Sequence, residues 1–196
     1  FSDSRQLIKS LDTVLQQKTI HILINNTGGP PGGPIVDARE SDFLSAYHNH
    51  LICNQLLMQA VLPGMKKAGF GRIINIISTS VKEPIEGLGV SNTTRWAVAS
   101  WAKTLSVELG PFGITVNNVL PGFTATARLE EIIQKRMAKT GETRENVESA
   151  MKSQVPLKRF ASPQEIAAAV AFLASPAAGY INGVNLPVDG GRTKSL

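Results

Sequence analysis

The stretch GRIINIISTS, Gly71 to Ser80, is an apolar run of strand-forming residues that ends abruptly in small polar ones. Short apolar runs bounded by turn-forming residues are typical of strands that are buried on both faces, as in a parallel sheet. Three more segments have the same form: TIHILINN (19–26), GITVNNVL (113–120) and GVNLPVDGG (183–191). The chain therefore contains four predicted buried strands.

Helical segments separate these strands. We expect helices at about 3–17, 41–68, 91–109 and 162–175. The last begins with a capping box, in which Ser162 is the N-cap, Pro163 the first helical residue and Glu165 the third. Strands that alternate with helices predict an α/β fold with a doubly wound parallel sheet. With 196 residues, 42% of them hydrophobic, residues 1–196 are expected to form a single domain.

Composition restricts the class of protein. A single cysteine, Cys53, excludes an internal disulfide and favours a reducing, cytoplasmic compartment. The longest apolar run, Ile166 to Ala174, is too short to cross a bilayer, and no metal site is expected. Residues 127–160 hold eight Lys/Arg and five Glu, or +3 of the net charge of +5, but no nucleic-acid motif. This basic segment is either a solvated helical face or a rim around a site for an anion.

Each predicted strand is followed by a short polar or glycine-rich segment. These segments are NNTGG, ISTS, LPGFTAT and VDGG. Ligands of doubly wound sheets bind at the carboxyl ends of the strands, where such segments lie. A single segment of this kind is weak evidence, because loops are commonly rich in these residues for their turn geometry. Four in order predict a ligand site.

These motifs resemble those of the short-chain dehydrogenase/reductase family, most closely its 3-oxoacyl-acyl-carrier-protein reductases. ILINNTGG is similar to the family's Asn-Asn-Ala-Gly element, with Thr27 in place of alanine, and GRIINIIS to the strand before its catalytic serine. GPFGITVNNVLPGFTAT is similar to the Pro-Gly element on the nicotinamide side, and PLKRFASPQEIAAAVAFLAS to the C-terminal helix. The resemblance covers essentially the whole chain. It implies a Rossmann-like fold with NADP or NAD as cofactor.

The resemblance also implies roles for individual residues. Ser78 occupies the position of the serine that polarises the substrate oxygen, and His50 that of an asparagine that helps a water relay protons. Ser91 stands where the family has its proton-transferring tyrosine, and Arg95 where it has the lysine that holds the nicotinamide ribose. The implied cofactor-binding residues are Asn26, Thr27, Gly28, Arg95, Pro121, Gly122, Thr124 and Thr126.

Ser91 and Arg95 differ chemically from the residues that they replace. An aliphatic hydroxyl is a much weaker acid than a phenol, whose pKa is about 10. Arg95 stays cationic and can grip ribose hydroxyls, but it cannot shuttle a proton. The alternative is structural: Ser91 caps the helix that follows, and Arg95 pairs with a carboxylate such as Glu83 or Glu86.

His50 is the candidate replacement for the missing acid/base, because an ordinary histidine pKa near 6.5 suits proton transfer at neutral pH. Three residues earlier, Tyr47 is expected on the same helix face, while His48 faces elsewhere. The alternative is that His50 is a satisfied core residue. For Tyr180 a structural role is favoured.

The family's glycine-rich phosphate turn does not precede ILINN in this sequence. TGGPPGGP (27–34) is rich in glycine, but it follows the fourth strand of the family order, and its prolines lack backbone donors. The resemblance implies three earlier strands in two βαβ units, roughly 50–60 residues. Without them, HILIN (21–25) is an exposed apolar sheet edge. We therefore expect a longer protein; the alternative is a true fragment that needs a partner strand.

Two functions follow from these observations. The first is an oxidoreductase that transfers hydride between a nicotinamide cofactor and a carbonyl or alcohol substrate, similar to a 3-oxoacyl thioester, with residues 123–160 as substrate lid. The second is a non-catalytic protein of the same fold that binds a dinucleotide or metabolite, or acts in an assembly. The resemblance implies a homodimer or homotetramer through the helices at 41–68 and 91–109. The stripe of Trp101, Leu105 and Leu109 is compatible with this, or with burial against the sheet.

Overall fold

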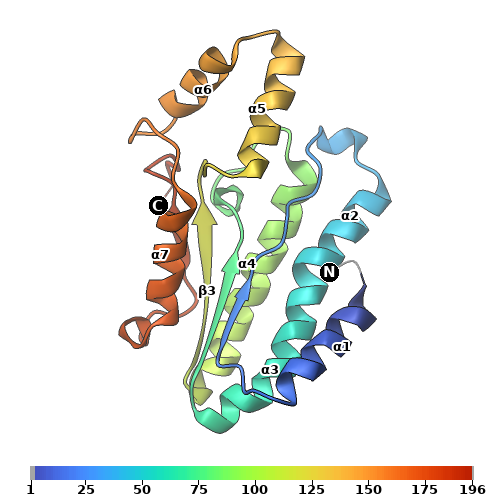
Figure 1. Ribbon diagram of the computed structural model, residues 1–196, viewed down its shortest axis with the longest axis vertical. Coiled ribbons are helices and arrows are strands. Elements are labelled where there is room, and N and C mark those ends of the chain that lie inside the picture. The colour runs from blue at the N-terminus through green and yellow to red at the C-terminus, as the bar shows by residue number, and fades with distance from the viewer. Residues whose placement is uncertain (1–2, 196) are drawn as a thin grey trace.

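The computed structural model describes residues 3–195. Its four strands form one parallel sheet in the order β1-β2-β3-β4, so that neighbours in sequence are neighbours in space (Figure 1). The strands are β1 (Ile22–Asn25), β2 (Gly71–Ile76), β3 (Ile114–Pro121) and β4 (Asn185–Val188). Three of them lie within the segments that the apolar runs predict, and β3 extends one residue beyond its predicted segment, to Pro121.

Helices occupy the connections between the strands. They are α1 (Ser4–Leu15), α2 (Glu40–Tyr47), α3 (Cys53–Ala68), α4 (Gly89–Leu109), α5 (Ala127–Thr140), α6 (Arg144–Ser153) and α7 (Pro163–Ala174). Short 3-10 turns are η1 (Ile35–Asp37), η3 (Thr79–Val81), η4 (Gly110–Phe112) and η5 (Pro176–Ala178). The capping box of α7 is confirmed: Ser162 Oγ accepts from the Glu165 N–H, and the Glu165 carboxylate accepts from the Ser162 N–H at 2.8 Å.

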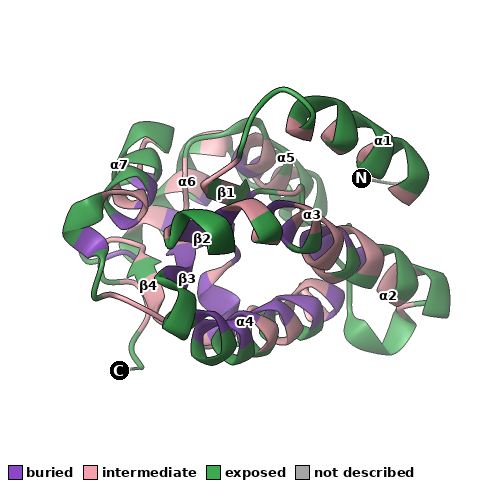
Figure 2. Ribbon diagram, turned by 90° about the horizontal axis from the view of Figure 1, so that it is seen from below, coloured by how far each residue is buried: buried purple, intermediate pink, exposed green. Residues whose placement is uncertain are grey.

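The sheet is covered on both faces, which confirms the doubly wound architecture. On one face, Ile73 and Val116 pack against α3 and α4 through residues such as Met58 and Leu105. On the other face, Ile74 of β2 and Val119 of β3 pack against α7. Figure 2 shows the buried residues concentrated on β2, β3 and α4. The predicted stripe on α4 faces this core: Leu105 and Leu109 are buried and Trp101 is half-buried.

An unbroken row of asparagine side chains crosses the sheet. Asn25, Asn75, Asn118 and Asn185 lie opposite one another in the strand register. Each amide nitrogen donates to the carbonyl oxygen of the next asparagine, from Asn25 to Asn185, and each of the three bonds is 2.8 Å long. The first three asparagines are buried. Because side chains alternate along a strand, the row lies on the face that α3 and α4 cover.

The predicted continuous helix over 41–68 is wrong in one respect. A π-helical turn, η2 (His48–Ile52), separates α2 from α3. A π turn contains more residues than an α turn, so it rotates the side chains that follow it onto a different face. Tyr47 is therefore exposed whereas His50 is buried, and the predicted common face of these two residues is not formed.

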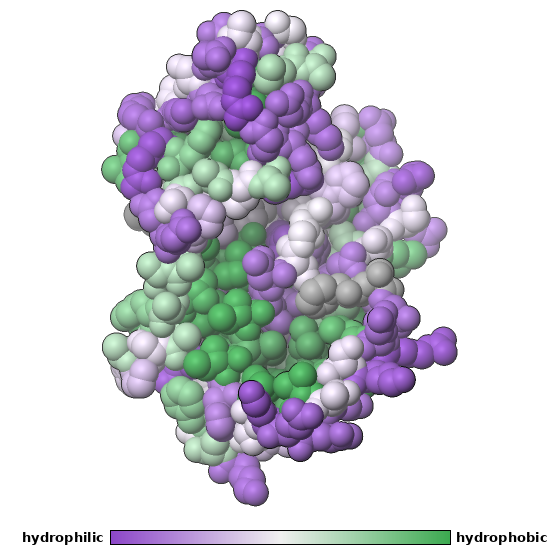
Figure 3. All heavy atoms as spheres, in the orientation of Figure 1, coloured by the Kyte–Doolittle hydropathy of each residue, from purple (hydrophilic) through white to green (hydrophobic). Residues whose placement is uncertain are grey.

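β1 is an edge strand of this sheet. Its side chains Ile22 and Ile24 are 44% and 49% exposed, which confirms the predicted apolar edge. Figure 3, in the orientation of Figure 1, shows a hydrophobic area in the middle of this face of the molecule. An exposed apolar edge strand is a surface on which further strands can pair.

Candidate active site

The predicted site segments meet at the carboxyl edge of the sheet. Asn26, Thr27 and Gly28 follow β1, Ser78 follows β2, and residues 121–126 end and follow β3. Because the strands are parallel and in register, these segments share one edge, beneath α5 and α6 (Figure 1). Residues 123–160 form a helical hairpin there, whose small core contains Leu129, Ile133, Val147 and Met151.

Ser78 is held by the turn that it begins. Its backbone is extended, and its Oγ accepts a hydrogen bond of 3.0 Å from the Ser80 N–H. Among the described residues no acceptor takes the hydroxyl hydrogen of Ser78. A hydroxyl that already accepts one hydrogen bond has its own hydrogen left to donate. Ser78 is therefore oriented as a donor to an oxygen placed at the carboxyl edge.

Arg95 points into the protein rather than toward solvent. It is 6% exposed, and its guanidinium donates to the backbone carbonyls of Ile76 (3.1 Å) and Thr27 (3.3 Å). Burial lowers the pKa of Arg95 to about 10, so it remains cationic at neutral pH. The predicted ion pair with Glu83 or Glu86 is not formed among the described residues. Arg95 instead binds two backbone carbonyls near the ends of β1 and β2, and no sequence pattern predicts these contacts.

His50 is buried beside the loop that follows β1. Its Nδ1 lies 2.5 Å from Thr27 Oγ1, a contact whose donor depends on the imidazole tautomer. Burial, and secondarily the charge of Arg95, lower the pKa of His50 to about 4. The expected pKa near 6.5 is therefore wrong, because the solvent that would stabilise an imidazolium is excluded. At neutral pH, His50 is a neutral imidazole that both donates and accepts.

Ser91 lies inside α4 and does not cap it. The helix begins at Gly89 with Leu88 as N-cap, and no side chain caps it. Ser91 is half-buried, and its carbonyl accepts from Thr94 Oγ1 at 3.3 Å. The predicted capping role is therefore wrong. The helix begins two residues earlier than predicted, at Gly89, where a side chain would collide with Ile35 of η1.

The Pro-Gly element packs closely against the end of β4. Gly122 donates to the Val188 carbonyl at 3.0 Å, and a Cβ at Gly122 would lie 2.7 Å from the Cα of Asp189. Glycine is needed here for this close approach of two backbones. Pro121 and Thr124 are half-buried. Thr126 is the exposed N-cap of α5 and makes no side-chain capping bond.

The glycine-rich loop after β1 is occupied by contacts within the protein. Gly33 donates to the Gly87 carbonyl at 2.8 Å, and a Cβ at Gly32 would lie 3.1 Å from that same oxygen. Arg128 at the start of α5 donates to the Pro30 carbonyl at 2.9 Å and so joins the loop to α5. By contrast, Asn26 and Gly28 are exposed, and the space around Gly28 is open.

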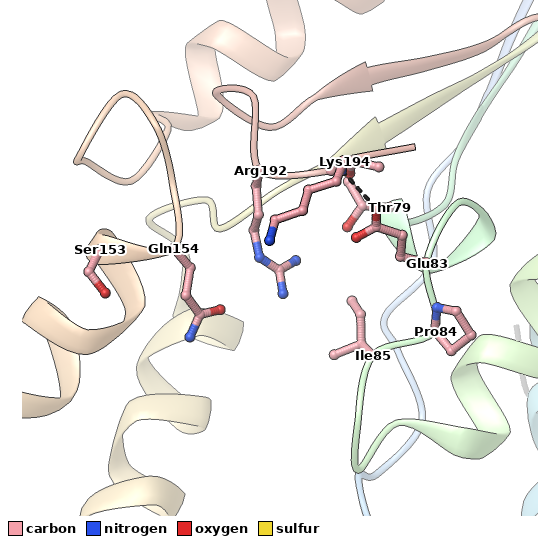
Figure 4. A pocket seen from close by; sticks show the side chains of 9 residues that line it. Thr79, Glu83, Pro84, Ile85, Ser153, Gln154, Arg192 and Lys194 are labelled. Carbon is pink, nitrogen blue, oxygen red and sulfur yellow. Dashed lines mark hydrogen bonds between the residues drawn. The ribbon is translucent and has the colours of Figure 1, made fainter. Parts of the chain in front are cut away.

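A cavity of about 370 Å³ includes in its lining Thr79, the residue after Ser78 (Figure 4). Its lining consists of Thr79, Glu83, Pro84, Ile85, Ser153, Gln154, Arg192, Thr193 and Lys194. Thr79 directly follows Ser78, and residues 192–194 come from the tail that follows β4. The sequence analysis did not single out this tail. In the sequence, the basic residues of DGGRTK lie directly after a strand end, and this pattern points to residues 192–194.

Part of the basic segment 127–160 is paired within itself. Arg144 contacts both Glu130 and Glu148, and Glu148 also contacts Lys152. Hydrogen bonds from Arg144 and Gln134 lower the pKa of Glu130 to about 2. These pairs favour the solvated helical face over the basic rim.

Tyr180 is fully exposed and does not pack in the core, so its predicted structural role is not seen. In residues 3–195, no three His, Cys, Asp or Glu side chains are grouped so that they could hold a metal ion. The same residues contain no helix that is long and apolar enough to span a bilayer.

Comparison with known proteins identifies the family. Residues 2–193 match the family model described as enoyl-(acyl carrier protein) reductase. The NADPH-dependent reductase BacG of Bacillus subtilis is 33% identical over 177 residues, which cover 90% of this chain and 68% of that protein. The 3-oxoacyl-[acyl-carrier-protein] reductase FabG of Haemophilus influenzae is 34% identical over 188 residues, with 93% and 73% covered.

The solved structures show the same relationship. The crystal structure of YwfH, an NADPH-dependent reductase involved in bacilysin biosynthesis, superposes with a TM-score of 0.93 at 31% identity. The match covers 100% of this chain and 76% of that one. The sheet order, the strand-end segments and these matches agree, and the chain belongs to the short-chain dehydrogenase/reductase family of oxidoreductases.

Proposed function

We propose that this chain takes part in hydride transfer between NADPH or NADH and a carbonyl or alcohol carbon. The observation that carries the proposal is the position of Ser78 at the carboxyl edge, where its Oγ accepts from the Ser80 N–H and its own hydrogen is left to donate. A fixed donor stabilises the negative charge that develops on a carbonyl oxygen as hydride arrives at its carbon. The names of the relatives, which are reductases, support the same chemistry.

The residues at this edge fit the nicotinamide half of a dinucleotide. The open space around Gly28 admits a ligand close to the backbone, and Thr27, Pro121 and Thr124 flank it along the edge. Thr126 leaves the first-turn N–H groups of α5 without a side-chain cap, which favours a phosphate there. Bound nicotinamide supplies the hydride. Arg95 is committed to backbone carbonyls, so in this proposal it positions the loop rather than the ribose.

In this proposal the proton comes from water. With a pKa of about 4, His50 carries no proton to release at neutral pH, so it does not act as an imidazolium acid. A neutral imidazole that contacts Thr27 Oγ1 can still pass a proton along a chain of hydrogen bonds, accepting at one nitrogen and donating at the other. His50 thus orients and relays, Ser91 makes no transfer, and water gives the proton, with the hydroxide that remains neutralised by bulk solvent.

The proposal extends to the surroundings of the chain. Trp96 on α4 is 51% exposed, and Val107 on the same helix is 70% exposed. Apolar residues exposed on a helix support a homodimer or homotetramer through α3 and α4.

The single cysteine, buried in α3, suits a reducing cytoplasm. A 3-oxoacyl thioester is one candidate substrate, since it is what the name of FabG describes.

The test is oxidation of NADPH or NADH by the purified protein with a panel of ketones and 3-oxoacyl thioesters, and reduction of NADP⁺ or NAD⁺ with the corresponding alcohols. Ser78→Ala is expected to lower kcat about 100-fold or more, the cost of losing one charge-stabilising donor. The matched control is Ser100→Ala, an exposed serine on α4. Tight cofactor binding with no turnover of any substrate would reject the proposal and favour the non-catalytic binder.

A further inference from the structure

The tail after β4 is fixed by two carboxylates that bind backbone rather than cations. Asp189 accepts from the N–H groups of Gly191 (2.9 Å) and Thr193 (2.8 Å). Glu83 accepts from the N–H groups of Lys194 (2.7 Å) and Ser195 (2.9 Å). Both oxygens of Asp189 and one oxygen of Glu83 are thus bound to backbone, which sets the course of the tail.

This arrangement leaves two cations without a carboxylate partner. Among the described residues, no ion pair or hydrogen bond involves the guanidinium of Arg192 or the ammonium of Lys194. Figure 4 shows the Arg192 side chain directed into the cavity, between Gln154 and Ile85, with the Lys194 amino group beside it. A dashed line there marks the bond that keeps Glu83 on the tail.

Arg192 is also held in place and partly desolvated. Its guanidinium carbon lies 4.3 Å from the centroid of the Phe123 ring, a stacking geometry that arginine favours. Burial lowers the pKa of Arg192, and the charge of Arg136 adds to this, against the attraction of Asp189 and Glu83. Arg192 is fixed, half-buried and close to the positive charges of Lys194 and Arg136. A ligand anion would therefore stabilise the charge of Arg192.

The anion-binding groups lie at a set position relative to Ser78. Thr79 lines the same cavity and directly follows Ser78, and Glu83 ties the tail to this same segment. The cavity volume of about 370 Å³ is at the small end of the range for ligand pockets, about 300–1,000 Å³. A ligand that fills this cavity against Thr79 and Arg192 is therefore a small molecule.

We propose that the substrate is a small carbonyl compound that carries a carboxylate, with its carbonyl oxygen at Ser78 and its carboxylate bound by Arg192 and supported by Lys194. A planar guanidinium binds a carboxylate through two parallel hydrogen bonds, which fixes both position and orientation. This inference rests on the proposed function, because that function places the reacting oxygen at Ser78.

The first experiment measures binding without turnover. Acetoacetate and its uncharged methyl ester are titrated by calorimetry into the full chain with NADP⁺ present. Acetoacetate is expected to bind about 10- to 100-fold more tightly than the ester, the worth of a hydrogen bond to a charged group. Arg192→Gln is expected to remove this preference, and Arg192→Lys to retain part of it. Equal affinity for the acid and the ester would overturn the proposal.

The control is Arg5→Gln, which removes an exposed positive charge on α1. It is expected to leave the preference for the acid unchanged, whereas a similar loss in this variant would assign the effect to net charge and overturn the proposal. Unfolding of each variant in urea shows whether Arg192→Gln is folded. If it is not, Arg192→Lys and Lys194→Gln serve as the test, with a smaller loss of preference expected in each and an unchanged preference in both overturning the proposal.

The second experiment separates this inference from the proposed function. If no carbonyl compound is reduced but the acid still binds selectively through Arg192, the hydride-transfer proposal fails and the anion site stands. If acyl thioesters are reduced better than acids, and Arg192→Gln leaves their kcat/KM unchanged, the activity stands and the carboxylate inference fails.

Discussion

Substitution of Asn75 by leucine tests the asparagine row directly. The change removes two hydrogen bonds of 2.8 Å and leaves the amide nitrogen of Asn25 and the carbonyl oxygen of Asn118 buried without their partners. Each buried polar group left in this way costs about 1–3 kcal/mol. We therefore expect Asn75→Leu to lower the free energy of unfolding by about 2–6 kcal/mol, a large part of the ~5–15 kcal/mol of a typical domain.

A double-mutant cycle with Asn118→Leu separates the row from general packing effects. Each single variant strands two polar groups, but the double variant also strands only two, the Asn25 nitrogen and the Asn185 oxygen. The double variant should therefore be less destabilised than the sum of the singles, by about 2 kcal/mol or more. Urea unfolding followed by tryptophan fluorescence measures all three, with the exposed Asn146→Leu as control. Additive costs, or a single cost below about 1 kcal/mol, would refute the reasoning.

Two further predictions concern the candidate site. With a pKa of about 4 when folded and about 6.5 when unfolded, His50 binds more protons in the unfolded state between these values, so stability falls by about 3 kcal/mol as the pH drops from 6.5 to 4. His50→Asn should flatten this part of the pH profile of urea unfolding; a parallel profile in His50→Asn contradicts the assignment. Ser91→Tyr restores a phenol and should raise kcat at least 10-fold, within the roughly 10²–10⁴-fold worth of general acid catalysis. Ser91→Phe adds the ring without the hydroxyl, and an equal gain in that variant contradicts a role for the proton.

The fold could be predicted because its signals are local. The strands are apolar runs bounded by turn-formers, and the start of α7 is marked by the capping box of Ser162, Pro163 and Glu165. The π turn at His48–Ile52 has no such signal, since the residues around it continue a helical pattern. At the start of α4, Gly89 lies against Ile35, a contact that only the folded chain makes.

The position of the candidate site could be predicted from the sequence better than the chemistry of its side chains. The strand-end segments that carry Thr27, Ser78 and Gly122 do lie on one edge. The partners of Arg95 could not be predicted, because they are backbone carbonyls, which every residue has. The pKa of His50 depends on how much solvent its neighbours exclude, and the role of Arg192 depends on the cavity that it lines, although its place directly after a strand end is a sequence signal.

The bridge that Arg95 makes has a consequence for motion. One rigid, planar guanidinium holds the Thr27 carbonyl of the loop after β1 and the Ile76 carbonyl at the end of β2. The loop and the strand end therefore behave as a single lever, and neither shifts alone without breaking a bond to a buried charge. We predict that a cofactor that shifts the loop at Gly28 also shifts the backbone two residues before Ser78. Cofactor and substrate would then each change the affinity of the other by the same factor.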